Sequence, residues 1–149
     1  MFDWATLRPI WEPRVLAVLR IMIGLLFLEH GTAKVLAFPH VQNHVAWMLT
    51  SLNPGIQGLI ELVGGLLIAL GLLTRPVAFI LSGDCAVAYF MAHASRGFFP
   101  LQNGGNGGEL AIVYTFVFLY FSVAGAGAWS LDRLWMSRPD ASIGAASRA

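Results

Sequence analysis

Eight ionisable side chains lie within, or at the ends of, long apolar segments of this chain, and their types could support binding or proton chemistry. They are Arg20, Glu29, His30, Lys34, Glu61, Asp84, His93 and Glu109. A charged side chain at the bilayer centre costs about 2.5–3.5 kcal/mol on insertion scales, so such residues usually face a protein interior, a partner or a polar cavity. Their placement therefore indicates where a functional site should lie.

Carboxylate, imidazole and ammonium groups beside aromatic side chains suggest a polar head-group site near the outer end of a helix bundle. Apolar walls, polar groups at the carbonyl ends and nearby proton acceptors would suit a quinone. The candidate ligand-binding residues are His30, Lys34, Glu61, His93, Glu109 and Tyr120. The alternative is structural: Lys34 with Glu61, and Arg20 with Asp84, would form ion pairs that fix the helix register.

A metal site and a partner contact are further hypotheses. His40 and His44 stand four residues apart, so their imidazoles would share one face of a helix and could hold a metal. The sequence fixes no third ligand, and the favoured alternative is that both histidines simply face water at the interface. Glu29 falls on the opposite side of its helix from Arg20 and Lys34, at about 100° per residue. Glu29 therefore either contacts a second subunit or lies high enough on the helix to reach the membrane interface.

The elements that must hold these residues are apolar segments long enough to cross a membrane. Hydrophobic residues make up 57% of the chain and charged residues only 11%, against about 25% charged in soluble domains. A spanning helix needs roughly 20 apolar residues. The windows that qualify are about Val15–Phe38, Ile56–Leu73, Val77–Ala94 and Leu110–Ala128. Short connections between them predict an all-α, integral membrane, antiparallel four-helix bundle.

Helical spacing also predicts which face of each span points inward. The expected inner stripe of the first span is Arg20, Gly24, Phe27, Gly31 and Lys34, and that of the second is Glu61, Gly64, Gly65, Ile68 and Leu72. The expected stripe of the last span is Glu109, Val113, Phe116, Tyr120 and Gly127. In the third span, Asp84 and His93 fall on opposite sides.

Less apolar segments flank and connect the spans. Residues 1–14 carry Trp4 and Trp11 at helical spacing, which predicts an interfacial segment. Apolar residues on one face of Pro39–Leu52 predict a short interfacial helix at the outer surface. Residues 136–149 are small and polar, which predicts a flexible tail.

The distribution of arginine and lysine predicts the orientation. With four spans, both termini and the turn between the second and third spans share one side. That side carries Arg8, Arg14, Arg75, Arg133, Arg138 and Arg148, whereas the other carries Lys34 and Arg96. The positive-inside rule then places both termini in the cytoplasm.

Several functions are disfavoured by composition and motifs. The nearly neutral charge balance argues against nucleic acid as a partner. Because Cys85 is the single cysteine, no intrachain disulfide can form. Cys85 is expected to act as a small residue packed in the interior. The glycine-rich run Gly104–Gly108 is not a phosphate loop, because no strand precedes it and no Lys-Ser/Thr follows.

Motifs in a fixed order resemble the DoxX family of bacterial membrane proteins. The first is Arg20-x-x-x-Gly24-x-x-Phe27-x-x-His30-Gly31-x-x-Lys34, and the second is Glu61-Leu-Val-Gly64-Gly65 with Leu70-Gly71-Leu72-Leu73-Thr74-Arg75. The others are His93 with Gly97-Phe98-Phe99 and Gly108-Glu109, then Gly125-Ala126-Gly127 with Ser130-Leu131-Asp132, where Ala126 replaces the usual proline. The resemblance covers about residues 15–135, as one membrane domain.

The resemblance implies a bacterial inner-membrane protein that serves as a small subunit of a quinone-linked redox complex, because family members include a subunit of a thiosulfate:quinone oxidoreductase. Any enzymatic activity would then belong to the larger complex. The alternative is a non-catalytic accessory, anchoring or assembly subunit. A solute or proton pathway formed by oligomers ranks last, because no broken helix pair is evident. Lipid and other membrane subunits are the expected partners.

Overall fold

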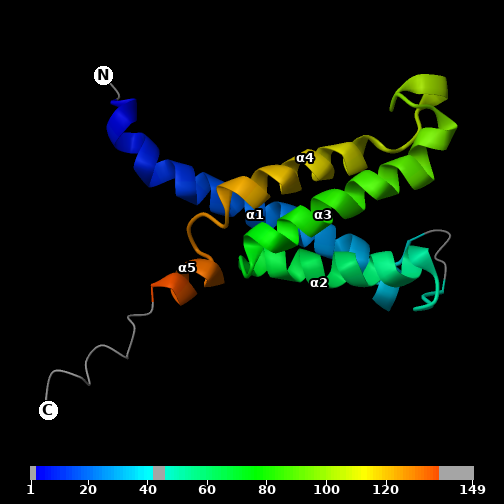
Figure 1. Ribbon diagram of the computed structural model, residues 1–149, viewed down its shortest axis with the longest axis horizontal. Helices are drawn as coiled ribbons and strands as arrows, with labels where there is room; N and C mark the ends of the chain where they lie inside the picture. The colour runs from blue at the N-terminus through cyan, green and yellow to red at the C-terminus, as the bar shows by residue number, and fades with distance from the viewer. Residues whose placement is uncertain (1–2, 42–45, 138–149) are drawn as a thin grey trace, which may run out of the picture.

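The computed structural model describes residues 3–41 and 46–137, and within these ranges the chain is helical and contains no strand. The main helices are α1 (Trp4–Leu36), α2 (Gln57–Leu70), α3 (Thr74–Ala88), α4 (Glu109–Ala124) and α5 (Leu131–Met136) (Figure 1). Between them lie the π-helical turns η1 (Leu52–Ile56) and η2 (Tyr89–His93) and the 3-10 turns η3 (Ala94–Arg96) and η4 (Gln102–Gly104). The predicted all-α class is confirmed.

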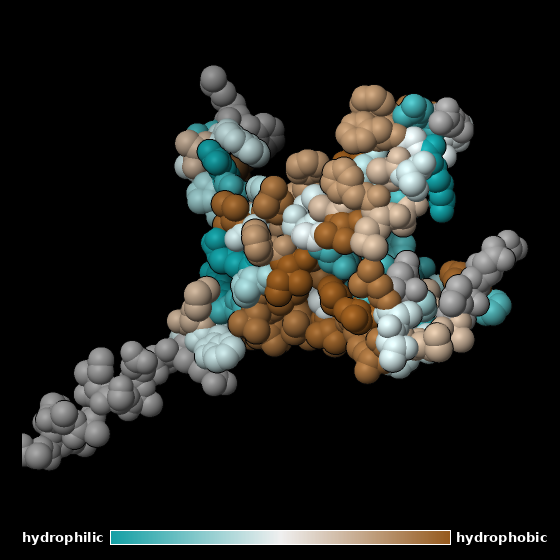
Figure 2. Space-filling view, turned by 45° about the vertical axis from the view of Figure 1, so that its right-hand side comes forward, coloured by the Kyte–Doolittle hydropathy of each residue, from teal (hydrophilic) through white to brown (hydrophobic). Residues whose placement is uncertain are grey.

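Two helical stretches of the described chain are long and apolar enough to cross a membrane. They are α1 and the continuous stretch Thr74–Arg96, which consists of α3, η2 and η3. Pro54–Leu70 and Glu109–Ala124 are shorter apolar helices. Hydrophobic residues gather across the middle of the face in Figure 2, and hydrophilic residues lie toward its ends. This distribution is typical of a chain surrounded by lipid around its middle.

Helix α1 takes in most of the predicted N-terminal segment. The Asp3 side chain accepts a hydrogen bond from the Ala5 amide at 3.1 Å and so caps the helix. Pro9 and Pro13 lie inside α1, which then continues to Leu36 with no break. Residues 4–14 are therefore the first turns of α1, and Figure 1 shows these turns extending beyond the packed helices.

The short helix expected over Pro39–Leu52 is wrong where the structure describes that segment. Residues 39–41 and 46–51 contain no helix, only a single turn in which the Ser51 amide donates to the Met48 carbonyl at 3.0 Å. The remainder of the segment, including His44, lies outside the described residues. The Trp47 indole instead donates to the Gly55 carbonyl at 3.1 Å, and the Ser51 hydroxyl accepts from the Gly55 amide at 3.0 Å. These bonds fold the segment back onto η1, which a pattern of apolar spacing does not predict. Of the predicted tail, residues 138–149 also lie outside the described part.

The helices pack as two close pairs, α1 with α2 and α3 with α4, while α2 also contacts α3. Small residues bring the first pair together: a Cβ atom at Gly24 would lie 2.5 Å from the Ala69 nitrogen, and one at Gly65 would lie 2.6 Å from the Leu28 nitrogen. Such close backbone approach is the small-xxx-small packing of membrane helices. The buried faces of α1 and α2 follow the predicted stripes, apart from the half-buried Lys34 near the end of α1 and the half-buried Leu72, which lies beyond α2.

The predicted inner face of the last span is wrong. Phe116 and Tyr120 are 64% and 53% exposed. The buried residues of α4 are instead Tyr114, Phe118 and Phe121, which repeat at positions i, i+4 and i+7. Phe118 packs edge-on against Phe27 of α1, with ring centroids 4.9 Å apart. The aromatic spacing, rather than the position of Glu109, determines the inner face of α4.

Candidate functional site

A cavity of about 240 Å³ lies between the two helix pairs. Figure 1 shows the pair α1–α2 and the pair α3–α4 diverging toward the end that carries η1 and the η3–α4 loop. Both pairs line the cavity. The structure brings together four of the predicted ligand-binding residues here: His30, Lys34, Glu61 and His93.

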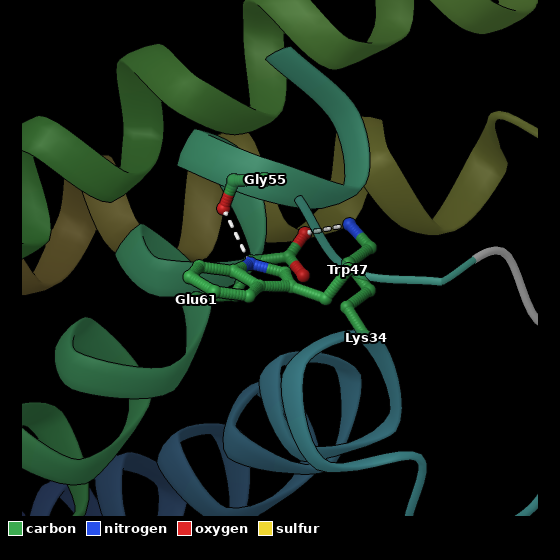
Figure 3. Close-up of polar contacts among 4 residues, drawn as sticks. All are labelled: Lys34, Trp47, Gly55 and Glu61. Atoms are coloured by element: carbon green, nitrogen blue, oxygen red, sulfur yellow. Dashed lines mark hydrogen bonds and ion pairs between the residues drawn. The ribbon is translucent and has the colours of Figure 1, made fainter. Parts of the chain in front are cut away.

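Lys34 and Glu61 form the predicted ion pair, with Lys34 Nζ 2.6 Å from Glu61 Oε1 (Figure 3). Glu61 is 5% exposed, and its second oxygen, Oε2, has no hydrogen-bond partner within the described chain. The Lys34 side chain is 24% exposed. A buried carboxylate needs its remaining lone pairs satisfied. The ion pair therefore neutralises charge but leaves one buried acceptor unused.

His93 reaches the cavity through the π-helical turn η2, in which the Ala94 amide donates to the Tyr89 carbonyl. An i→i+5 turn advances each residue by a smaller angle than an α-helical turn, so it rotates His93 back toward the face of Cys85. Cys85 is buried, as expected, and lines the same cavity. A regular helix would turn His93 farther from that face.

The Nδ1 atom of His93 lies 2.9 Å from the carbonyl oxygen of Asn106. A carbonyl can only accept, so Nδ1 carries a proton and, in the neutral ring, Nε2 is the free acceptor. The ring also stacks on Tyr89, with centroids 6.4 Å apart. His93 is thus held in one orientation with one defined tautomer.

Asn106 organises the loop before α4, and the sequence reasoning missed it. The side chain is 1% exposed, donates to the Gly97 carbonyl at 2.7 Å and accepts from the Gly108 amide at 2.7 Å. The Tyr89 hydroxyl donates to the Phe98 carbonyl in the same loop. Asn106 stands among glycines, where no periodic pattern marks a buried residue; the preference of asparagine for local backbone bonds is the one available signal.

Tyr114 also lines the cavity and was missed. Its ring packs edge-on against Phe27 and His30, at centroid distances of 5.2 and 6.1 Å. The residue is buried, but its hydroxyl makes no hydrogen bond to any described residue. The i, i+4, i+7 aromatic spacing with Phe118 and Phe121 would have identified it. Tyr114 adds a phenol donor to the cavity.

Two predicted ligand-binding residues lie elsewhere. Glu109 is exposed at the first position of α4, where the helix dipole favours a carboxylate. Tyr120 faces a separate hollow beside Trp4 and Trp11 on the N-terminal half of α1. Neither lines the cavity that holds Glu61 and His93.

The expected Arg20–Asp84 ion pair is wrong. Arg20 is fully buried, and its guanidinium donates to backbone carbonyls at the end of α2 and in the α4–α5 connection. The acceptors are Ala126 at 2.8 Å, Ile68 and Ala69 at 2.6 Å, and Trp129 at 2.9 Å. Backbone carbonyls at a helix end and in a connection can satisfy an arginine without a carboxylate, and the Ile68 carbonyl accepts from Arg20 in addition to the Gly71 amide. Asp84 instead lines a small cavity of about 80 Å³ beside Gln57, and its Oδ2 has no partner within the described residues.

The described residues proposed for a metal site or a partner contact, His40 and Glu29, are exposed. No group of three or more histidine, cysteine, aspartate or glutamate side chains that could hold a metal occurs in the described ranges. His40 is exposed, and His44 lies outside those ranges. Glu29 is exposed on α1 among Leu25 and Leu26, which are also exposed.

Comparison of the sequence with known proteins identifies a matching family and several relatives. A family model described as DoxX matches residues 15–94. An uncharacterized protein of Haemophilus influenzae is 44% identical over 131 residues, which cover 86% of this chain and 96% of that protein. The "Inner membrane protein YqjF" of Escherichia coli is 29% identical over 126 residues, covering 78% of this chain and 88% of that protein.

A more divergent relative, described as an uncharacterized membrane protein of Mycobacterium tuberculosis, is 27% identical over 153 aligned positions. These positions cover 93% of this chain and 92% of that protein. No solved structure matches the chain. The similarity to these relatives therefore extends over most of the chain.

Proposed function

The chain belongs to the DoxX family, and from this membership we propose that it is a small multi-pass protein of the bacterial inner membrane. In this proposal α1, α2, the stretch Thr74–Arg96 and α4 cross the bilayer as an antiparallel four-helix bundle. The N-terminal turns of α1, the α2–α3 turn and α5 share one end of the molecule (Figure 1). That end carries Arg75 and Arg133, so the positive-inside rule assigns it to the cytoplasm.

The function that we favour is binding of a quinone head group, as one subunit of a larger redox complex. The observation that carries this proposal is the cavity of about 240 Å³ lined by Glu61, His30, His93 and Tyr114, where Glu61 keeps one buried oxygen without a hydrogen bond to a described residue. Engineered apolar cavities of about 150 Å³ bind benzene. A single substituted ring therefore fits the space, with its apolar tail directed along the helices.

Proton chemistry at this cavity suits the reduced form of the ligand. A hydroquinone has two hydroxyl donors, and Glu61 Oε2 and His93 Nε2 supply acceptors from α2 and from η2. Oxidation to the quinone releases two protons to these bases and two electrons to a redox partner. The Tyr114 hydroxyl can then donate to a quinone carbonyl. Each side chain thus has a proton role at a named atom.

The electrons must leave through another protein or a diffusible carrier, so the proposal includes a redox-active partner. The chain itself would supply an oriented pocket and the proton acceptors. This division assigns any measured oxidoreductase activity to the complex rather than to the isolated subunit.

Ligand retention by variants of the cavity tests the proposal. The purified protein is equilibrated with a short-chain benzoquinone and its hydroquinone, and bound ligand is counted by native mass spectrometry. Glu61→Gln should lower hydroquinone retention about tenfold or more, because hydrogen bonds to charged groups contribute about 1.5–3 kcal/mol. Tyr114→Phe should lower quinone retention, whereas Tyr120→Phe, outside the cavity, should not. Equal retention by all of these proteins would contradict the proposal.

An accessory or assembly role is the second candidate, and Glu29 is the observation that favours it. This carboxylate is exposed beside the exposed Leu25 and Leu26 and makes no hydrogen bond or ion pair with a described residue. A lipid-facing charge is costly, so a partner is the expected neighbour. Glu29→Gln should then abolish co-purification of a partner from native membranes, whereas Glu61→Gln should preserve it. The reverse pattern would exclude this role for Glu29.

A further inference from the structure

A second, wider cavity lies at the opposite end of the molecule, away from the proposed quinone site. Its volume is about 660 Å³, and the start of α3, the connection after α4 and the helix α5 border it. Arg75 and Arg133 both line it, together with Asp132. The cavity therefore combines an excess of positive side chains with an open mouth.

Arg75 presents a free hydrogen-bonding edge at this cavity. Its Nη1 donates to the carbonyls of Val123 and of Ser122, the latter at 3.4 Å, and this anchors the guanidinium to the end of α4. A Cβ atom at Gly125, where φ is +84°, would lie 3.2 Å from Arg75 Nη2 and 3.3 Å from Nε. Glycine at this position thus lets the chain pass close to the guanidinium, and no hydrogen bond of Arg75 Nε or Nη2 to a described residue is present. Two parallel N–H groups of this kind match the oxygens of a phosphate.

Arg133 supplies the second positive charge. It is exposed on α5, and its side chain makes no hydrogen bond or ion pair to a described residue. The neighbouring Asp132 is already occupied: its two carboxylate oxygens accept from the amides of Leu73 at 2.6 Å and Thr74 at 2.9 Å. Asp132 thus holds α5 against the start of α3 and does not neutralise Arg133.

Thr74 offers a further hydrogen-bond donor at this cavity. The residue is fully buried and lines the cavity, yet its hydroxyl Oγ1 has no hydrogen-bond partner among the described residues. Buried hydroxyls are nearly always hydrogen-bonded, so an exception calls for an unseen partner. A phosphate oxygen at the mouth of the cavity could accept this bond after a small adjustment of the side chain.

From these contacts we propose that the cavity binds the phosphate group of an anionic phospholipid, with Arg75 and Arg133 as charge partners and Thr74 as an additional donor. One phosphodiester carries a single negative charge, which balances two arginines and one aspartate. Trp135 and Met136 of α5 also line the cavity and are exposed, so they would offer apolar contacts to the acyl chains of such a lipid. Tryptophan is enriched at the headgroup level of a membrane, and basic pockets at helix ends bind anionic headgroups.

Lipid retention in mixed vesicles tests the proposal. The full chain is reconstituted in nanodiscs of equal phosphatidylglycerol and phosphatidylcholine, extracted gently and analysed by native mass spectrometry. The wild type should retain phosphatidylglycerol in preference to phosphatidylcholine. Arg133→Gln should reduce that preference about fivefold, as expected for one arginine near a headgroup. Equal retention of the two lipids by the wild type would overturn the proposal.

Matched variants separate a built site from general electrostatic attraction. Arg8→Gln removes the same charge from an exposed residue at the same end, where Arg8 pairs with Glu12. The proposal requires Arg8→Gln to behave as the wild type; equal losses in both arginine variants would refute it. Thr74→Val should weaken phosphatidylglycerol retention and Thr74→Ser should restore it, whereas a Thr74→Val protein with wild-type retention would remove Thr74 from the site.

Addition of inorganic phosphate distinguishes a lipid headgroup from a free phosphate ion as the ligand of this cavity. Addition of phosphate in the millimolar range should leave lipid retention unchanged if the headgroup is the ligand. Displacement of phosphatidylglycerol by phosphate alone would show that the site takes a free phosphate, and would overturn the assignment to lipid. None of these measurements depends on quinone binding.

Discussion

Gly31 of α1 lies directly against the backbone of Leu62 in α2, so closely that a Cβ atom at position 31 would collide with the Leu62 nitrogen and Cα. The same helix pair carries both Lys34 and Glu61. The reach of a lysine side chain from one helix to a carboxylate on the next depends on this separation. Packing of small residues therefore determines the geometry of the ion pair that borders the cavity.

Gly31→Ala should destabilise the protein by about 1–3 kcal/mol, the range for inserting a methyl group into a close-packed contact. Gly83→Ala is the matched control, because a Cβ atom there meets nothing within 4 Å. Gly83→Ala should be neutral or stabilise by about 0.5–1 kcal/mol, as alanine does inside a helix. The stabilities of both variants are measured by unfolding the detergent-solubilised protein with increasing dodecyl sulfate. Similar stabilities for the two variants would show that the helices separate easily at Gly31.

Arg20→Lys should cost more than about 3 kcal/mol, because an ammonium cannot replace a planar guanidinium that serves four carbonyls. The Arg8→Lys protein should match the wild type, since Arg8 is exposed and forms only a surface ion pair. Thermal unfolding of the two variants in the same detergent is the measurement. Wild-type stability in Arg20→Lys would mean that water can satisfy those carbonyls.

Asn106→Asp should destabilise the loop before α4 by about 1–3 kcal/mol. The carboxylate can still accept from the Gly108 amide but cannot donate to the Gly97 carbonyl. Amide hydrogen exchange over residues 97–108 should rise, because the loop loses its anchor. Gln102→Glu, at an exposed position in the same loop, is the control. Unchanged exchange in Asn106→Asp would indicate that other contacts hold the loop.

Lys34→Met should destabilise the protein more than Glu61→Gln. The first change leaves a buried carboxylate without its partner, whereas the second leaves a lysine whose side chain is 24% exposed and can reach water. The double variant should recover part of the loss in Lys34→Met. A double-mutant cycle of unfolding free energies measures this coupling. Additive losses would show that the two side chains do not stabilise each other.

The fold class and the inner faces of α1 and α2 could be predicted because apolar and small residues repeat there without interruption. The inner face of α4 could not be predicted from Glu109, since a carboxylate at a helix start is stabilised by the helix itself and need not face inward. His93 reaches the cavity through a π-helical turn, which no spacing rule at 3.6 residues per turn anticipates.

Pairing rules failed for Arg20 for a different reason. Sequence reasoning matches charges with charges, but the acceptors of Arg20 are carbonyls of Ile68, Ala69 and two later residues, which have no sequence signature. The Lys34–Glu61 pair was predictable because both residues stand on stripes that glycines bring together. Charge pairing is thus predictable within a packed helix pair and not across a helix end.

The two polar contacts beside the cavity each lie within one part of the molecule. Lys34 and Glu61 belong to the pair α1–α2, and His93 and Asn106 belong to the continuous segment that joins α3 to α4. If the two helix pairs move apart, neither contact has to break. Ligand exchange can therefore proceed by rigid movement of one half against the other, and the energetic barrier to entry would come from separating aromatic side chains such as Phe27 and Tyr114 rather than from disrupting an ion pair.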